Sequence, residues 1–297
     1  MRRLSRALPL PLLAFAAPAL AHSGGAADHH APPGWTLDPW IVAPLALAAL
    51  LFARGWRRLH ARSGQGSGAL RRRGLLYAAG LLVLAAALVS PLHEAGERSF
   101  AAHMFEHELL MLVGAPLLVL AEPLAVMLWA FPSKTRRTLA AVVPVIAAPW
   151  RRLTGAVTAT VLQAVALWLW HAPALFDRAL ASEGWHVAQH LSFLVTALLF
   201  WTAMLHRRTA AGIAALCLVA TAIVSGALGA LMAFATSPWY AGYASLGMAP
   251  FGLTPAEDQQ LAGLLMWVPG GLVHAGAALL LMRRLLADPR EGIFHAR

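Results

Sequence analysis

Two pairs of histidines carry the clearest chemical signal in this sequence. His103 and His107 are four residues apart, and so are His186 and His190. On a helix, residues with this spacing share one face, with their Cβ atoms roughly 6 Å apart. Imidazole nitrogens are ligands for zinc, copper, iron and nickel. If the two helices enter from the same side to the same depth, the four rings predict a single metal site.

Five more side chains are candidates for the same site. His171 ends a predicted helix at the same level, and Met104 and Met111 flank the first pair. Thioether and imidazole ligands together favour copper, especially Cu(I), although methionine is also common packing material. Glu106 is a candidate hydrogen-bond acceptor for a ligand ring. Asp258 either orients a ligand histidine or caps a helix.

Other interpretations of these residues stay open. The pattern His103-x-x-Glu106-His107 matches a zinc-protease motif in which two histidines bind zinc and the glutamate is the general base. The second pair carries Gln189 at the matching place, and an amide cannot act as a base, so a duplicated hydrolase site is excluded. A haem held by two histidines on facing helices is a second alternative. A lone histidine in a span more often makes an interhelical hydrogen bond, but two matching pairs favour a functional site.

The elements that must position these rings are membrane helices. Of the 297 residues, 59% are hydrophobic and only 12% are charged, and the mean hydropathy is +0.65. A soluble domain carries about 25% charged residues. Apolar blocks long enough to approach the roughly 20 residues of a membrane helix predict an all-α, polytopic membrane bundle of seven transmembrane helices. The predicted spans are Pro39–Phe52, Leu75–Val89, Phe100–Leu120, Ala156–Trp170, Trp185–Leu205, Ala210–Phe234 and Leu261–Met282.

The N-terminal residues 1–21 have the features of a secretory signal peptide. A basic start and an apolar stretch lead to a small-x-small cleavage site at Ala19-Leu20-Ala21; an uncleaved anchor helix is the alternative. Cleavage would leave His22 at the N-terminus, where amine and imidazole together form a copper chelate. The predicted organisation is then a flexible histidine-containing tail over 22–37, the membrane domain over 38–284 and a cytoplasmic tail over 285–297.

Basic residues predict the orientation of the spans. Residues 54–73 hold seven arginines and no acid, and residues 131–152 hold five more basic residues. With seven spans, these loops and the basic C-terminal end fall on one side, which predicts a multi-pass protein of the plasma (inner) membrane with its mature N-terminus outside and its C-terminus in the cytoplasm. The net charge of +10 is therefore a topology signal and does not indicate nucleic acid as a partner.

This orientation separates the histidines. The two pairs and His171 lie on the extracytoplasmic side, whereas His274 lies alone, roughly 10 Å deeper by helix rise, where a structural hydrogen bond is the preferred interpretation. Leu124–Phe131 is apolar but too short to cross. It is expected to lie at the inner interface or to continue the third helix past Pro123.

Four motifs, in order along the chain from about His93 to Arg284, resemble a known family. They are His103-Met-x-x-His107-x-Leu-Leu-Met-Leu with Pro116-Leu-Leu-x-Leu-x-x-Pro123; Trp170-His171-x-Pro173 with Phe176-Asp177-x-Ala-Leu180; His186-x-x-x-His190-x-x-Phe193 ending in Phe200-Trp201; and Asp258-Gln259-Gln260-x-x-Gly263-Leu-x-Met266-Trp267. Together they resemble the CtaG family of cytochrome c oxidase assembly factors, the seven-span type first associated with caa3 oxidases.

The resemblance implies a role in maturing the oxidase by forming or supplying its copper centre, and not an enzymatic one. It also implies that the partners are cytochrome c oxidase subunits, with other copper chaperones as further candidates, in a lipid bilayer. Copper is then the expected metal, with zinc and haem as the alternatives from the residues alone.

Overall fold

The computed structural model describes residues 33–62, 67–206 and 209–287 of the chain. This part is helical, apart from connections and one isolated bridge between Ala249 and Leu253, which confirms the all-α prediction. The predicted signal peptide and His22 lie outside the described residues. The longer helices are α1 (Pro39–His60), α2 (Ser67–Leu88), α4 (Phe100–Glu108), α7 (Ser133–Leu153), α8 (Ala156–Trp170), α9 (Pro173–Ala181), α10 (Glu183–Leu205), α11 (Ala211–Ala233) and α13 (Pro255–Ala287).

Shorter elements connect these helices. They are α3 (Pro91–Gly96), the π-helix η1 (Leu109–Gly114), α5 (Ala115–Ala121), α6 (Pro123–Met127), the 3-10 helix η2 (Leu128–Ala130), α12 (Ala241–Ser245) and the 3-10 helix η3 (Pro250–Gly252). The predicted third span is thus a continuous run of α4, η1 and α5 over Phe100–Ala121. It carries a π-type turn in its middle, a feature that is frequent at functional sites.

Five helices of the described residues are long and apolar enough to cross a membrane: α1, the Phe100–Ala121 run, α10, α11 and α13. The bent pair of α7 and α8 brings the number to six if it is one span, with a bend of 69° between them. The predicted number of seven is not confirmed. By this test α2 is too charged, because Arg71, Arg72 and Arg73 occupy its beginning, and α8 has only 15 residues.

Two basic segments predicted as loops are largely helical. Most of residues 54–73 belongs to the end of α1 and the start of α2, because arginine is a good helix former. Residues 133–153 form α7, which buries no residue. Apolar side chains in its middle, such as Val142 and Ile146, are about half exposed, and basic residues stand at both ends.

The chain breaks between α5 and α6, at the place where the sequence left two possibilities open. Glu122 adopts a left-handed conformation with φ 48°, and Pro123 begins α6. Proline disfavours the helical conformation in the residue before it and has no N–H to donate. The third helix therefore does not continue past Pro123; α6 and η2 form separate short helices that pack on α1, where Arg58 donates to the Ala130 carbonyl at 2.9 Å.

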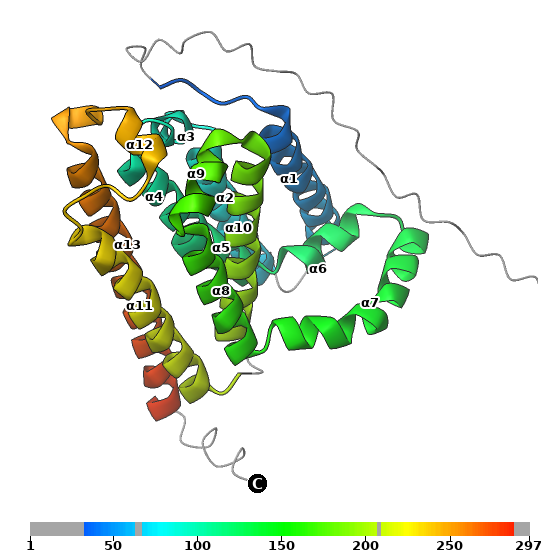
Figure 1. Ribbon diagram of the computed structural model, residues 1–297. Coiled ribbons are helices and arrows are strands. Elements are labelled where there is room, and N and C mark those ends of the chain that lie inside the picture. The colour runs from blue at the N-terminus through cyan, green and yellow to red at the C-terminus, as the bar shows by residue number, and fades with distance from the viewer. Residues whose placement is uncertain (1–32, 63–66, 207–208, 288–297) are drawn as a thin grey trace, which may run out of the picture. The chain divides into compact units, whose positions relative to one another are not determined.

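Helices α11 and α13 run side by side along most of their length (Figure 1). A Cβ atom on Gly263 would lie 2.5 Å from the Gly229 carbonyl oxygen. Only glycine permits this approach of two backbones, which is the small-residue packing common in membrane helices. The core of the bundle is formed mainly by α4, α8, α10, α11 and α13; its fully buried side chains include Met104, Phe193, Phe200, Leu218 and Met232.

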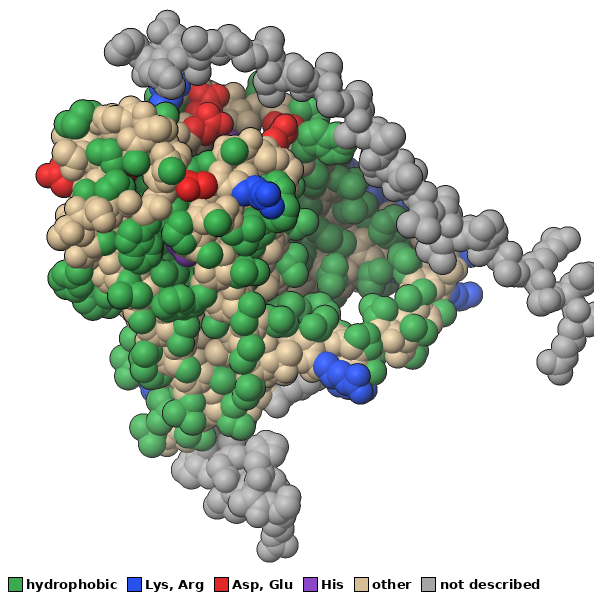
Figure 2. Space-filling view, in the orientation of Figure 1, with side chains coloured by type: hydrophobic (Ala, Val, Ile, Leu, Met, Phe, Trp, Pro, Cys, Tyr) green, Lys and Arg blue, Asp and Glu red, His purple; other side chains and the backbone are tan. Residues whose placement is uncertain are grey.

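The outer surface is the reverse of a soluble protein's surface. Hydrophobic side chains are spread over much of the face seen in Figure 2, and the acidic side chains visible there lie in its upper part. Many leucines are more than half exposed, including Leu50, Leu82, Leu216, Leu272 and Leu279. Lipid tails provide the apolar surroundings that such side chains require.

Candidate metal centre

Helix α4 presents the first histidine pair to the inside of the bundle. Ser99 caps this helix, its side chain accepting a 3.2 Å hydrogen bond from the Ala102 amide. His103 and His107 follow on the buried face, with exposed fractions of 2% and 1%. The cap fixes where the helix begins, and with it the direction in which both rings point.

The second pair meets the first from α10. The ring centroids of His103 and His107 are 4.4 Å apart, those of His186 and His190 are 4.3 Å apart, and those of His107 and His190 are 4.7 Å apart. His103, His107 and His190 each offer a ligand atom within 4.8 Å of the others. The structure therefore brings all four rings together, and three of them are close enough to hold one ion.

Hydrogen bonds fix which nitrogen of two rings faces the centre. The Tyr243 hydroxyl donates to the Gly96 carbonyl at 2.6 Å, so its oxygen accepts from Nδ1–H of His103 at 3.1 Å. In the same way, Nδ1–H of His190 donates to the His186 carbonyl at 3.1 Å. A neutral imidazole carries one N–H and one lone pair. Nε2 of both rings is therefore left with the lone pair that a metal requires.

Several nitrogens of the cluster have no hydrogen-bond partner among the described residues. These buried atoms are Nε2 of His103, both ring nitrogens of His107 and Nε2 of His186. A buried polar atom without a partner costs about 1–3 kcal/mol. A metal ion bound among these atoms would take one lone pair from each ligand ring, so the donor set fits an imidazole-ligated metal.

Glu106 lies at the edge of this cluster and links it to a residue that the sequence analysis had not selected. Its Oε1 is 2.8 Å from Nδ1 of His93 and 3.2 Å from Nε2 of His190. His93, Glu106 and His190 form a second group with ligand geometry. Nδ1 of His190 already holds a proton, so Nε2 faces the Glu106 carboxylate with a lone pair. This contact becomes favourable when Nε2 gains a second proton or when a cation binds there.

His93 stands in α3, outside the predicted spans. Burial opposes its charged form, but the hydrogen bond and the negative charge of Glu106, aided by Glu97 and Glu94, raise the pKa of His93 above the usual 6.5. Its ring also stacks on His186 with centroids 5.5 Å apart. His93 was not connected with the two pairs from the sequence, because no spacing rule linked it to them.

His171 lies beside the cluster but not in either ligand group. Its Nδ1–H donates to the Leu167 carbonyl at 2.7 Å, and its Nε2 is 3.2 Å from the sulfur of Met104. Phe176 and Phe193 contact His171 and also contact rings of the cluster. His171 and Met104 thus form a separate nitrogen–sulfur pair next to the four-histidine cluster.

Met111 and Asp258 lie elsewhere. The sulfur of Met111 accepts a 3.4 Å hydrogen bond from Gln163, deeper in the bundle. Asp258, at the start of α13, accepts hydrogen bonds from the Ser99 hydroxyl at 2.8 Å and the Phe100 amide at 2.6 Å. It therefore caps α4, a helix distant in sequence, and supports the first histidine pair without contacting it.

Tyr243 and Tyr240, two residues that sequence reasoning missed, close the outer end of the cluster. Tyr243 contacts His103 as described, and the Tyr240 hydroxyl donates to the His171 carbonyl at 3.1 Å. Asp177 holds the short helix α12 that carries Tyr243, accepting from the amides of Ala241 and Gly242 at 3.2 and 3.1 Å. Asp177 stood in a recognisable motif, whereas the two tyrosines carried no spacing signal.

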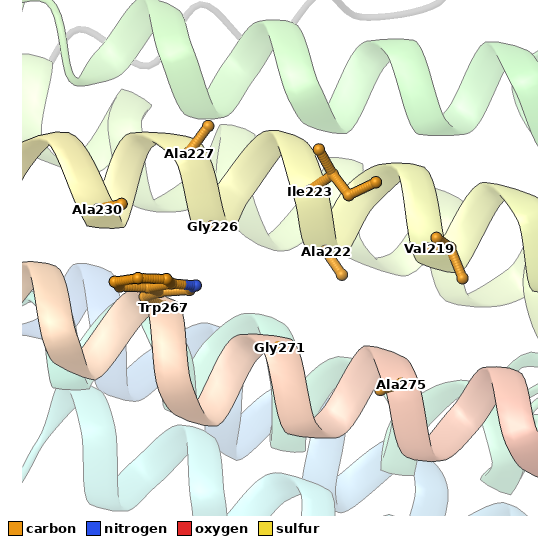
Figure 3. A pocket seen from close by; sticks show the side chains of 9 residues that line it. All are labelled: Val219, Ala222, Ile223, Gly226, Ala227, Ala230, Trp267, Gly271 and Ala275. Carbon is orange, nitrogen blue, oxygen red and sulfur yellow. The ribbon is translucent and has the colours of Figure 1, made fainter.

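A larger groove lies elsewhere and has no metal-binding character. It measures about 420 Å³ on the surface between α11 and α13, where Figure 3 shows Trp267 in the gap between the two helices. Its other lining residues are Val219, Ala222, Ile223, Gly226, Ala227, Ala230, Gly271 and Ala275. With this apolar lining, the groove suits lipid tails, and the metal-binding chemistry lies in the histidine cluster.

Comparison with known proteins identifies a family. The family model described as cytochrome c oxidase caa3 assembly factor matches residues 50–288, a range that contains both histidine pairs, His93 and Asp258. No curated protein and no solved structure matches the chain.

Proposed function

Because the chain belongs to the family of cytochrome c oxidase caa3 assembly factors, we propose that it aids oxidase assembly by holding copper at its four-histidine cluster. Membership in this family implies association with cytochrome c oxidase. The proposal adds two points to this association: the chain binds copper, and it takes part in forming the oxidase copper centre. Catalysis is not part of this role.

One observation carries the copper proposal: His103, His107 and His190 each offer a ligand nitrogen within 4.8 Å of the others. Among the described residues, Nε2 of His103 and both ring nitrogens of His107 have no hydrogen-bond partner. Imidazole alone suits several metals. The sulfur of Met104 next to His171 adds a soft donor at the same level. Soft thioether ligands favour Cu(I) over zinc, so the neighbourhood of the cluster supports copper.

The geometry gives less support to the two alternatives, a zinc protease and a haem-binding protein. A protease would need Glu106 to activate a water next to a substrate, but Glu106 is 0% exposed and its Oε1 contacts His93 and His190. A haem between two histidines would need a flat slot between the ligand rings. The rings of His107 and His190 instead touch, with centroids 4.7 Å apart.

The topology belongs to the same proposal. Seven spans, with α2 and α8 each taken as one crossing, would put the cluster at the extracytoplasmic face and the C-terminus in the cytoplasm of the plasma (inner) membrane. In this arrangement α7 lies along the inner surface, where its basic ends meet lipid headgroups. A cleaved signal peptide and a metal-binding His22 complete the proposal. Other copper chaperones are the partners that would supply the metal.

A deletion strain tests this function. Loss of the gene should lower oxidase activity and oxidase copper content while growth on fermentable carbon continues. The wild-type gene should restore both, and so should the control His60→Ala/His206→Ala, but His103→Ala/His107→Ala should not. Normal oxidase activity and copper content in the deletion strain would contradict the assembly role.

A further inference from the structure

A second polar cavity lies deeper in the bundle, about one helical turn beyond His107. It has a volume of about 30 Å³ and is bounded by α4, η1, α8, α11 and α13. Because a water molecule needs roughly 10–15 Å³ of such volume, the cavity holds about two waters or one unhydrated ion. Its lining includes two thioethers, Met111 and Met266, and five polar side chains: Glu108, Gln163, Thr221, Ser225 and His274.

Three of the polar side chains direct their protons away from the cavity. The hydroxyl of Thr221 donates to the Cys217 carbonyl at 2.9 Å, and that of Ser225 donates to the Thr221 carbonyl at 2.8 Å. Nδ1–H of His274 donates to the Gly270 carbonyl at 2.7 Å. Each donor is satisfied within its own helix, so these groups have only lone pairs left to offer.

The remaining polar groups extend this surplus of acceptors. Gln163 uses its amide nitrogen on Met111, and its Oε1 has no partner among the described residues; nor has Oε2 of Glu108. Neither lysine nor arginine is among the residues that line the cavity. A carboxylate inside a span is costly unless it is protonated or paired with a cation. The cavity therefore combines a buried carboxyl group with unused lone pairs.

The surrounding structure holds these groups in place. The indole of Trp201 donates to the Met111 carbonyl at 2.8 Å, which satisfies a backbone group of the π-helix η1. The same indole stacks on His274 with ring centroids 5.8 Å apart. Gly270 has no side chain, and a Cβ there would lie 3.5 Å from Oε2 of Glu108. The π turn, the indole and the glycine thus keep the carboxylate, the thioether and the imidazole around one small space.

We propose that this cavity is a second metal site, distinct from the four-histidine cluster, that binds one Cu(I) ion. A single carboxylate neutralises one positive charge, so a monovalent ion leaves the site neutral within the membrane. Met111 and His274 supply the soft sulfur and the imidazole nitrogen that Cu(I) prefers, and Glu108 supplies the charge. None of these three belongs to the outer cluster.

Copper titration of the purified full-length protein tests the two sites separately. Cu(I) is added without oxygen in the presence of a competing chelator, with every protein carrying His22→Ala so that the N-terminal chelate does not contribute, and bound copper per chain is measured. Wild type should bind two ions. Glu108→Gln and His103→Ala/His107→Ala should each bind one, and the combined variant none. Glu257→Gln, a matched change at an exposed carboxylate, should bind two.

Met111→Leu is a second variant, chosen because it nearly conserves the side-chain volume and is therefore not expected to misfold. It should keep the fold, weaken the deep site roughly tenfold or more, and lower the sulfur scattering in the X-ray absorption spectrum of the copper that remains in His103→Ala/His107→Ala, with Met266 as the other sulfur in the lining. Two ions in Glu108→Gln, or sulfur scattering unchanged by Met111→Leu, would overturn the deep site. A wild-type protein that binds one ion, lost only in Glu108→Gln, would instead overturn the outer site and leave the deep one standing.

Discussion

Asp258 and Ser99 are 159 residues apart in sequence and are joined by a 2.8 Å hydrogen bond from the serine hydroxyl to the carboxylate. The same carboxylate accepts from the Phe100 amide. The first turn of α4 is thereby attached to the beginning of α13. The position of the first histidine pair consequently depends on the packing of the last helix of the bundle.

Replacing Asp258 by Asn should weaken this attachment. The amide nitrogen of asparagine cannot accept from the Phe100 amide, so one of the capping bonds is lost, at a cost of about 1–2 kcal/mol. The expected result is a lower thermal unfolding midpoint of the detergent-solubilised protein and a lower copper occupancy. Glu257→Gln, next in sequence but exposed, is the control. An unchanged midpoint and unchanged occupancy would show that Asp258 does not support α4.

Loss of either histidine pair should nearly abolish copper binding at the outer cluster. His103→Ala/His107→Ala and His186→Ala/His190→Ala each remove at least one of the three converging ligand atoms. Elemental analysis of purified protein, with the deep site first inactivated by Glu108→Gln, measures the effect. His60→Ala/His206→Ala should have no effect. Full occupancy in both outer variants would mean that these rings only pack the helices.

Changing Glu106 to Gln should weaken metal binding without removing a ring. The carboxylate charge that faces His190 and His93 is lost, while the shape of the side chain is kept. Loss of a group that supports metal ligands typically reduces affinity by roughly 10- to 100-fold. Competition with a chelator of known affinity gives the value. If Glu106 instead acted as a hydrolytic base, the variant would keep its metal affinity and lose only a peptidase activity.

The metal-free protein should show a pH dependence that originates at His93. The folded-state pKa of His93 is raised, so its ion pair with Glu106 contributes stability below the unfolded pKa, and this contribution is lost as pH rises through the folded pKa. The difference in unfolding midpoint between wild type and His93→Gln, measured with a chelator present, should shrink with rising pH. A constant difference across this range would rule out a charged His93.

Labelling of single cysteines tests the topology in a Cys217→Ser background. A cysteine at Ser67, or one at Thr138 in α7, should react with membrane-impermeant reagents only after the cells are opened. A cysteine at Glu183, near the second histidine pair, should react in intact cells. Strong labelling at Ser67 in intact cells would contradict the seven-span arrangement.

Local geometry explains what the sequence could predict. The i, i+4 spacing of His103 with His107, and of His186 with His190, places each pair on one face of any helix that contains it. The length of the two apolar segments predicts that both are helices of one membrane bundle, because membrane helices have few ways to pack. These properties depend on neighbours in the chain, and so the four-ring cluster was predictable.

Properties that depend on distant contacts were not predictable. His93 reaches the cluster because the short helix α3 packs on α4, and Tyr243 reaches it because Asp177 holds α12. The helical conformation of residues 133–153 was also missed, because the basic residues at both ends of this segment were interpreted as parts of a loop. Met111 was expected near His103, but the π-helix and Gln163 direct it to the deep cavity.

Tyr243 also sets a condition on kinetics. Its hydroxyl lies between the Gly96 carbonyl and Nδ1 of His103. His103 itself is only 2% exposed. An ion that binds Nε2 of His103 therefore cannot exchange freely with the solution. Its entry and exit would require the side chains that bury His103 to move, so the residence time of a bound ion and its affinity would be set by different parts of the molecule.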